Sequence, residues 1–146
     1  MIHIGFTGTR HGMTLEQCMS LGELCDSAWF WRQPVVIHHG DCIGADAEFH
    51  AMMRRFTGIA AIVLHQPTDS THRAFCKFDE SRAPLPYLKR NKAIVSESER
   101  MIATPAEMSE QPRGGTWATI RMTRNVNKPL VIVWPDGRVT EERWGR

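Results

Sequence analysis

Short apolar runs alternate with longer segments of helical periodicity along the chain. Each run holds three to six mostly apolar residues, which is typical of a strand that is buried on both faces of a sheet. The runs therefore predict five β-strands. They cover residues 2–6, 35–38, 59–64, 101–103 and 130–134.

Four of the intervening segments carry apolar residues every three or four positions, which predicts amphipathic helices. The first segment opens on Thr14, and Gln17 follows it at the spacing of a capping box. Gly58 suits the position after the end of the second helix, and Pro86 suits the start of the third. The expected helices cover about residues 14–29, 45–56, 86–95 and 116–127.

Residues 65–86 show no clear period. A loop of this length inside a compact domain is usually functional, so we expect either a lid over a ligand site or a short helix that the pattern hides. Residues 136–146 follow a turn and are expected to form a C-terminal tail that adds a short hairpin strand.

Five apolar strands that alternate with helices predict an α/β fold, and 146 residues fit one domain. We expect a Rossmann-like, doubly wound sheet of about five parallel strands with helices on both faces, spanning residues 1–146. Such sheets bind ligands beyond the carboxyl ends of their strands. Glycine-bearing loops follow the first, second and fourth predicted strands, so these loops are the candidates for a ligand site.

The charge of the chain is nearly balanced, with 18 basic and 16 acidic residues. This excludes a generic basic coat for nucleic acid. Fourteen of the basic residues are arginines, which suit planar recognition of phosphate and carboxylate. Residues 113–146 hold seven basic and three acidic side chains, so the basic excess is C-terminal and indicates either a local anion site or a solvated tail.

The four cysteines form no Cys-x-x-Cys pair, no secretory pattern precedes them, and no apolar stretch is long enough to span a bilayer. We therefore expect a cytoplasmic protein with free thiols and no membrane partner. His38, His39, Cys42 and His50 lack the spacing of known zinc motifs, so neither a metal nor a cofactor is expected. A Cys42 nucleophile, assisted by His39 or His72, is a weaker alternative.

The loop after the first strand reads Gly5-Phe6-Thr7-Gly8-Thr9-Arg10. Gly8 allows a tight turn and close approach of a ligand, Thr7 and Thr9 offer hydroxyl groups, and Arg10 offers five N–H donors. The spacing differs from both the dinucleotide fingerprint and the Walker loop. The loop is either an anion site or an ordinary turn between strand and helix.

The loop after the second strand runs from His39 to Asp46. Gly40 and Gly44 bracket a turn whose backbone N–H groups could hold a phosphate. Asp41 could bind a ribose hydroxyl pair. Asp46 either serves the ligand or caps the following helix.

The loop after the fourth strand reads Arg113-Gly114-Gly115-Thr116 and enters a helix. Two glycines and a threonine at a helix start make a phosphate cradle, and Arg113 adds charge there. The alternative is a flexible turn with a capping threonine. Arg90 and Asn91, near the start of another helix, are by themselves more typical of a surface pair.

Together these loops resemble the SLOG superfamily, and in particular its small YspA-like branch. The matching stretches are Gly5 to Arg10, His39 to Asp46, Gly114 to Trp117 and Tyr87 to Asn91. They come in family order and cover nearly the whole chain. The resemblance implies a Rossmann-like domain that binds a nucleotide or a nucleotide-derived ligand, and related folds commonly pair through helices, which is compatible with a homo-oligomer.

One departure separates this chain from the Lonely Guy branch of that superfamily, which cleaves the base from a nucleoside 5′-monophosphate. That branch carries a catalytic glutamate in its Gly-Gly-x-Gly-Thr-x-x-Glu loop, and this position falls on Thr119. Residues 116–128 hold no acid, so hydrolysis would need Asp41 or Asp46 as the catalytic carboxylate.

We therefore expect a sensor, carrier or sequestering protein for a nucleotide or ADP-ribose-type ligand. An N-glycoside hydrolase is the alternative and single-stranded DNA binding a weaker one, since the low net charge does not favour nucleic acid. The candidate ligand residues are Thr7, Gly8, Thr9, Arg10, His39, Gly40, Gly44, Asp46, Arg90, Asn91, Arg113, Gly114, Gly115 and Thr116.

Overall fold

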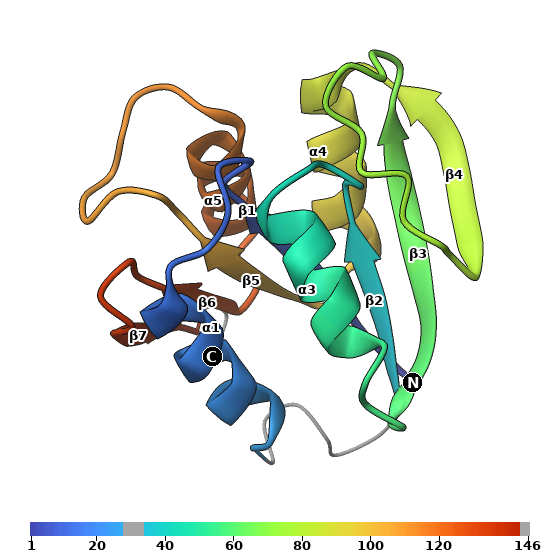
Figure 1. The fold of residues 1–146 in the computed structure, drawn as a ribbon. Coiled ribbons are helices and arrows are strands. Elements are labelled where there is room, and N and C mark those ends of the chain that lie inside the picture. The colour runs from blue at the N-terminus through green and yellow to red at the C-terminus, as the bar shows by residue number, and fades with distance from the viewer. Residues whose placement is uncertain (28–33, 144–146) are drawn as a thin grey trace.

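The computed structural model describes residues 1–27 and 34–143, which build one seven-stranded sheet (Figure 1). The strand order is β4-β3-β2-β1-β5-β6-β7. All neighbouring strands are parallel except β7, which runs antiparallel to β6. The strands are β1 (Ile2–Gly8), β2 (Val35–His39), β3 (Ile59–Pro67), β4 (Glu80–Leu85), β5 (Arg100–Thr104), β6 (Leu130–Val133) and β7 (Val139–Glu142).

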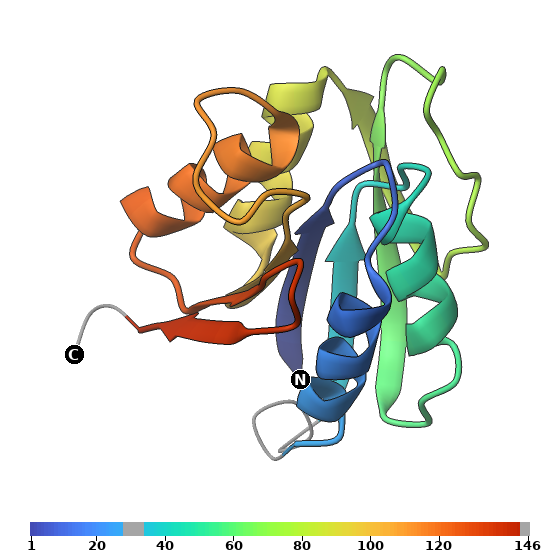
Figure 2. The ribbon, with the colours of Figure 1, turned by 60° about the vertical axis from the view of Figure 1, so that its left-hand side comes forward.

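Helices cover both faces of this sheet, as Figure 2 shows. One apolar core lies between the sheet and the pair α1 and α3, and includes Leu21 and Phe49. The other lies between the sheet and the pair α4 and α5, and includes Ile94 and Trp117. The two cores follow from strands that are apolar on both faces. The helices are α1 (Leu15–Cys25), α3 (Ala45–Met53), α4 (Tyr87–Glu97) and α5 (Gly115–Asn125).

Local sequence signals fix several of the helix ends. Thr14 and Gln17 form both hydrogen bonds of the capping box that starts α1, as predicted. Pro86 is the N-cap residue of α4. At the C-terminal end of α4, the Lys128 ammonium group donates to the carbonyl oxygens of Val95, Ser96 and Ser98. α1 ends at Cys25, and its expected continuation over residues 28 and 29 lies outside the described residues.

The segment 65–86 is a loop only over residues 68–79. It holds no helix in the described structure; instead β3 continues to Pro67, and residues 80–85 form β4. β4 lies at the edge of the sheet and is largely exposed, so it lacks the apolar run that predicts the other strands. The parallel part of the sheet therefore has six strands rather than five. The expected hairpin strand in the tail is confirmed as β7.

The strand order reverses at β1, which lies between β2 and β5. The loops that leave the carboxyl ends of these three strands are the three glycine-bearing loops that the sequence singles out. Such a reversal leaves a crevice beyond the strand ends, because the following helices leave on opposite faces of the sheet. None of the helices within residues 1–27 and 34–143 is long and apolar enough to cross a membrane.

Candidate functional site

A cavity of about 640 Å³ opens at this edge of the sheet, which is a usual size for a small-molecule site. Its walls come from the loop after β1, the first turns of α4 and α5, and the loop after β5. The predicted residues that line it are Thr7, Gly8, Thr9, Arg10, Gly40, Asp46, Arg90, Asn91, Arg113, Gly114, Gly115 and Thr116.

Arg90 is the most deeply placed cation of the cavity, with 5% of its surface exposed. Its Nε donates to Asn91 Oδ1 at 2.7 Å, and its Nη1 donates to the carbonyl oxygens of Gly40 at 2.6 Å and His65 at 3.2 Å. Its Nη2 contacts the Cys42 sulfur at 3.7 Å. All of these partners are neutral, and within residues 1–27 and 34–143 Arg90 forms no salt bridge. The guanidinium is therefore held rigidly while its charge remains available to an anion in the cavity.

The N-terminus of α5 faces the same cavity. Gly114 is its N-cap residue, makes no side-chain capping hydrogen bond, and no acidic residue lies in the first turn. The N–H groups at this end lack carbonyl partners within the helix and carry a partial positive charge. Exposed Arg113 precedes them and forms no salt bridge with any described residue. This geometry suits a phosphate or carboxylate group.

The loop after β1 forms another wall of the cavity. Position 8 requires glycine, because a Cβ atom there would overlap Thr104 and Ala45. The Thr9 backbone is used internally, because its carbonyl oxygen accepts from the N–H groups of Ala45 and Gly12. Arg10 is exposed and, among the described residues, makes no salt bridge. This wall therefore offers an exposed cation next to a closely packed turn.

The loop after β2 does not provide the phosphate cradle that its glycines suggest. The N–H groups of Gly40 and Cys42 donate to the Asp46 carboxylate, that of Ile43 donates to His72 O, and that of Ala45 donates to Thr9 O. These N–H groups therefore already have acceptors within the protein. Acidic residues in the first turn of α3 also offset the positive end of its helix dipole, which makes this loop a poor phosphate site.

Gly44 also has a packing role in this loop. It lies outside the cavity lining with a φ of 87°, and a Cβ atom there would overlap the backbone of Arg10. Only glycine combines this φ with such a close approach. Gly44 therefore joins the loops after β1 and β2 rather than touching a ligand.

Asp41 and His39 also lie outside the cavity lining. Asp41 is fully buried, its carboxylate contacts the Arg73 guanidinium at 2.8 Å, and it accepts from the Cys76 N–H at 2.9 Å. His39 is fully buried and accepts from the Asp41 N–H through Nδ1. Neither side chain is therefore placed to contact a ligand in the cavity, contrary to the expectation from sequence. Asp41 instead holds the loop 68–79 in place.

Asp46 keeps its candidate role, because its buried carboxyl group lines the cavity. Burial raises its pKa to about 6, against the opposing effect of the Arg90 charge and of the N–H groups of Cys42 and Gly40. A carboxyl group with such a pKa can exchange a proton near neutral pH, as general acid–base chemistry requires.

Cys42 lines the cavity but does not have the environment of an activated thiol. Burial and the nearby Asp46 carboxylate raise its pKa, although the contact with Arg90 acts in the opposite direction. The pKa of Cys42 is therefore not lowered as expected for a thiol at a helix N-terminus, because burial and then the Asp46 charge raise it. The structure therefore does not support the nucleophile alternative.

Several lining residues were not among the candidates. Trp117 is buried, packs against Trp134, and donates through Nε1 to Glu107 at 2.8 Å. Arg121 also lines the cavity but pairs with Glu110 at 3.2 Å. Glu107 and Glu110 come from the irregular loop after β5, where no sequence pattern signals their position. The other lining residues outside the candidate ligand set include Phe6, His11, Tyr87, Leu88, Ile94, Ala106, Pro112 and Ala118, together with His72, which was named only as a possible base for Cys42.

Comparisons with known proteins show the fold of this chain. No family model and no curated protein matches it. Among solved structures, it is similar to the X-ray structure of TM1055, a structural-genomics target, with a TM-score of 0.61 and 13% sequence identity. The match covers 89% of this chain and 72% of that chain. The chain thus has a Rossmann-like α/β fold, and at this identity the likeness extends to the fold alone.

Proposed function

We propose that the protein binds a nucleotide or a nucleotide-derived ligand of the ADP-ribose type in the cavity beyond β1 and β5. The observation that carries the proposal is Arg90, a buried cation that lines the cavity and has only neutral hydrogen-bond partners among the described residues. A buried charge is costly unless it is paired. The charge of Arg90 acts on the buried Asp46 carboxyl group, but the two side chains form no salt bridge in the described structure, so an anionic ligand group would supply the direct ion-pair partner of Arg90.

The distribution of charge around the cavity supports an anion as ligand. Four arginines line it, and within the described chain only Arg121 forms a salt bridge. Arg10, Arg113 and the start of α5 lie at exposed walls, where they would hold phosphate groups, and Arg90 would neutralise the inner part of the ligand. The resemblance of the loops to the SLOG superfamily is consistent with this division of roles.

The proposal is tested by denaturing the purified protein and identifying any released small molecule by mass spectrometry, followed by calorimetric titration with AMP, ADP and ADP-ribose. We expect saturable binding that is weakened in Arg10→Ala and Arg113→Ala variants. Arg143→Ala, at an exposed arginine after β7, is the matched control. Full affinity in a folded double variant that lacks both Arg10 and Arg113 would contradict the proposal.

A second candidate function is hydrolysis of the N-glycosidic bond of a nucleoside 5′-monophosphate, and Asp46 favours it. A buried carboxyl group with a pKa of about 6 in the cavity can activate water or protonate a leaving base. This candidate predicts release of free base, detected by chromatography, and loss of that release in Asp46→Asn. Binding without base release would leave the ligand-binding proposal alone.

A further inference from the structure

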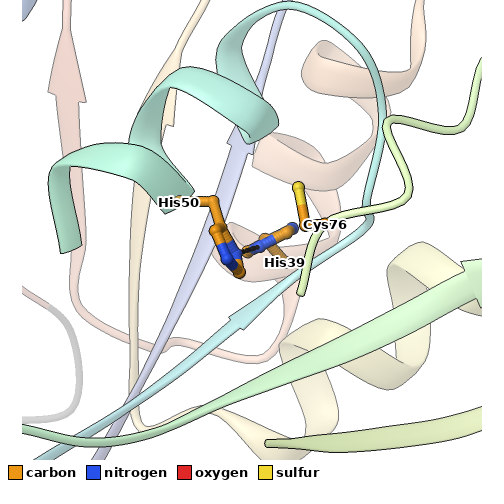
Figure 3. A group of neighbouring side chains, drawn as sticks. All are labelled: His39, His50 and Cys76. Carbon is orange, nitrogen blue, oxygen red and sulfur yellow. Dashed lines mark hydrogen bonds between the residues drawn. The ribbon is translucent and has the colours of Figure 1, made fainter. Parts of the chain in front are cut away.

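A second set of chemically reactive side chains lies outside the cavity lining. His39 at the end of β2, His50 in α3 and Cys76 in loop 68–79 point toward one another (Figure 3). One ligand-type atom from each residue lies within 4.8 Å of the other two. The two histidines are buried and Cys76 is partly buried. Since the three residues come from distant parts of the sequence, no spacing motif reveals them.

The hydrogen bonds around the histidines fix which nitrogen carries each proton. The Asp41 N–H donates to His39 Nδ1 at 3.0 Å, so the neutral His39 ring carries its proton on Nε2. That nitrogen lies 2.8 Å from His50 Nδ1 and donates to it. His50 Nδ1 therefore carries the lone pair that a metal requires, whereas His39 Nε2 carries a proton that it must lose before it can bind a metal.

The donor set selects the class of cation. Two imidazole nitrogens and one cysteine sulfur are ligands of borderline-soft metals such as Zn²⁺, and they do not suit Mg²⁺ or Ca²⁺. Two nitrogen ligands of a tetrahedral Zn²⁺ lie about 3.3 Å apart, so the two rings would have to separate by about 0.5 Å. The His39 ring must also turn away from the Asp41 backbone N–H, which donates to its Nδ1 at 3.0 Å.

The Asp41 carboxylate lies beside the cysteine and holds its backbone in place. It accepts from the Cys76 N–H at 2.9 Å and pairs with the Arg73 guanidinium at 2.8 Å. These contacts fix the loop that presents Cys76 to the two histidines.

A second group, His38, His65 and Glu97, also brings ligand-type atoms within 4.8 Å of one another. Its carboxylate is already paired, because Glu97 accepts from Arg82 at 2.8 and 2.9 Å. A metal there would have to displace or share this guanidinium. Among the described residues, no salt bridge or guanidinium hydrogen bond occupies the ligand atoms of His39, His50 or Cys76, so this group is the better site.

We propose that His39, His50 and Cys76 form a Zn²⁺-class metal site that ties loop 68–79 to β2 and α3. On binding, the Cys76 thiol releases its proton to solvent. His39 keeps one proton but carries it on Nδ1, so the hydrogen bond from Asp41 N–H is given up in exchange for the metal bond. His72 of the same loop borders the cavity, so the metal would also stabilise one wall of the ligand site.

The test is titration of the chelator-treated protein with Zn²⁺ and with Co²⁺. We expect one Zn²⁺ per chain, a Tm increase of about 5–10 °C at a free Zn²⁺ concentration 100 times the Kd, and a thiolate-to-Co²⁺ charge-transfer band. Cys76→Ser should abolish the band and weaken binding by at least about 100-fold, since even outer-shell partners contribute about 10–100-fold. Cys18→Ser, at a partly exposed cysteine of α1, is the matched control.

One further variant and two outcomes distinguish this site from metal binding at surface groups. His50→Gln should weaken Zn²⁺ binding while far-UV circular dichroism shows that the chain is folded. Metal binding that is equal in Cys76→Ser, Cys18→Ser and wild type would overturn the proposal and place the ion on surface groups. Absence of 1:1 binding by the folded wild-type chain would also overturn it, and would leave the His39–His50 hydrogen bond as the purpose of the cluster.

Discussion

The substitution Gly115→Asp separates ligand binding from folding. Gly115 is the first residue of α5 and lines the cavity. A Cβ atom there would meet only Asn91 Nδ2 at 3.6 Å, which is ordinary van der Waals contact. An aspartate in the first turn also interacts favourably with the helix dipole, by about 0.3–1 kcal/mol. We therefore expect the free energy of unfolding to stay equal or to rise slightly.

The same carboxylate should repel an anion bound at the helix start. At a separation of about 5 Å and an effective dielectric constant of about 20–40, two unit charges repel by about 2–3 kcal/mol. This energy corresponds to a Kd that is weaker by about 30- to 150-fold. The assay is calorimetric titration with the ligand identified by mass spectrometry, together with a thermal melt of each variant.

Gly115→Asn is the matched control, because it has nearly the same size without the charge. We expect this variant to retain most of the affinity. Equal affinity of Gly115→Asp and wild type would refute an anion at the start of α5. An equal loss in both variants would show that shape, rather than charge, governs this wall of the cavity.

Three further predictions concern stability. Gly44→Ala should lower the free energy of unfolding by about 2–4 kcal/mol, because the new Cβ atom is strained at a positive φ and overlaps the Arg10 backbone. An unchanged midpoint of urea unfolding would contradict this. Burial, the largest cause, lowers the pKa of His38 to about 3 and of His65 to about 4. Below pH 6.5 the unfolded chain therefore binds more protons than the folded chain. Between pH 7.5 and pH 5, each histidine should lower the free energy of unfolding by about 2 kcal/mol, measured by urea titration at each pH. An unchanged free energy of unfolding over this range would refute the neutral, buried state of these histidines. Thr14→Ala should lose about 1 kcal/mol of stability with its capping box, and an equal melting temperature would argue against that cap.

The fold follows from local patterns wherever those patterns report burial. The strands with apolar runs were predictable because parallel strands are covered on both faces. β4 was not, because Glu80–Leu85 lies at the exposed edge and carries little apolar signal. The edge is defined only by the order of strands, which a local pattern does not contain.

The position of the cavity was predictable, because the glycine-bearing loops meet at one edge of the sheet. Which groups of each loop are free to bind a ligand was less predictable. The loop from His39 to Asp46 has the composition of an anion cradle, yet tertiary partners such as His72 O and the Asp46 carboxylate take up its N–H groups. Sequence does not show which donors are already satisfied. Likewise, the convergence of His39, His50 and Cys76 depends on how loop 68–79 returns to the sheet.

The central claim is that an anionic, nucleotide-type ligand lies between Arg90 and the start of α5. An ¹H–¹⁵N NMR titration with AMP and with ADP-ribose tests it most directly, because each amide reports its own surroundings. We predict saturable shifts concentrated at the amides of Arg10, Gly115 and Thr116 and at the Arg90 Nε–H. Saturable shifts confined to another surface, or no shift at millimolar concentrations of either compound, would contradict the claim.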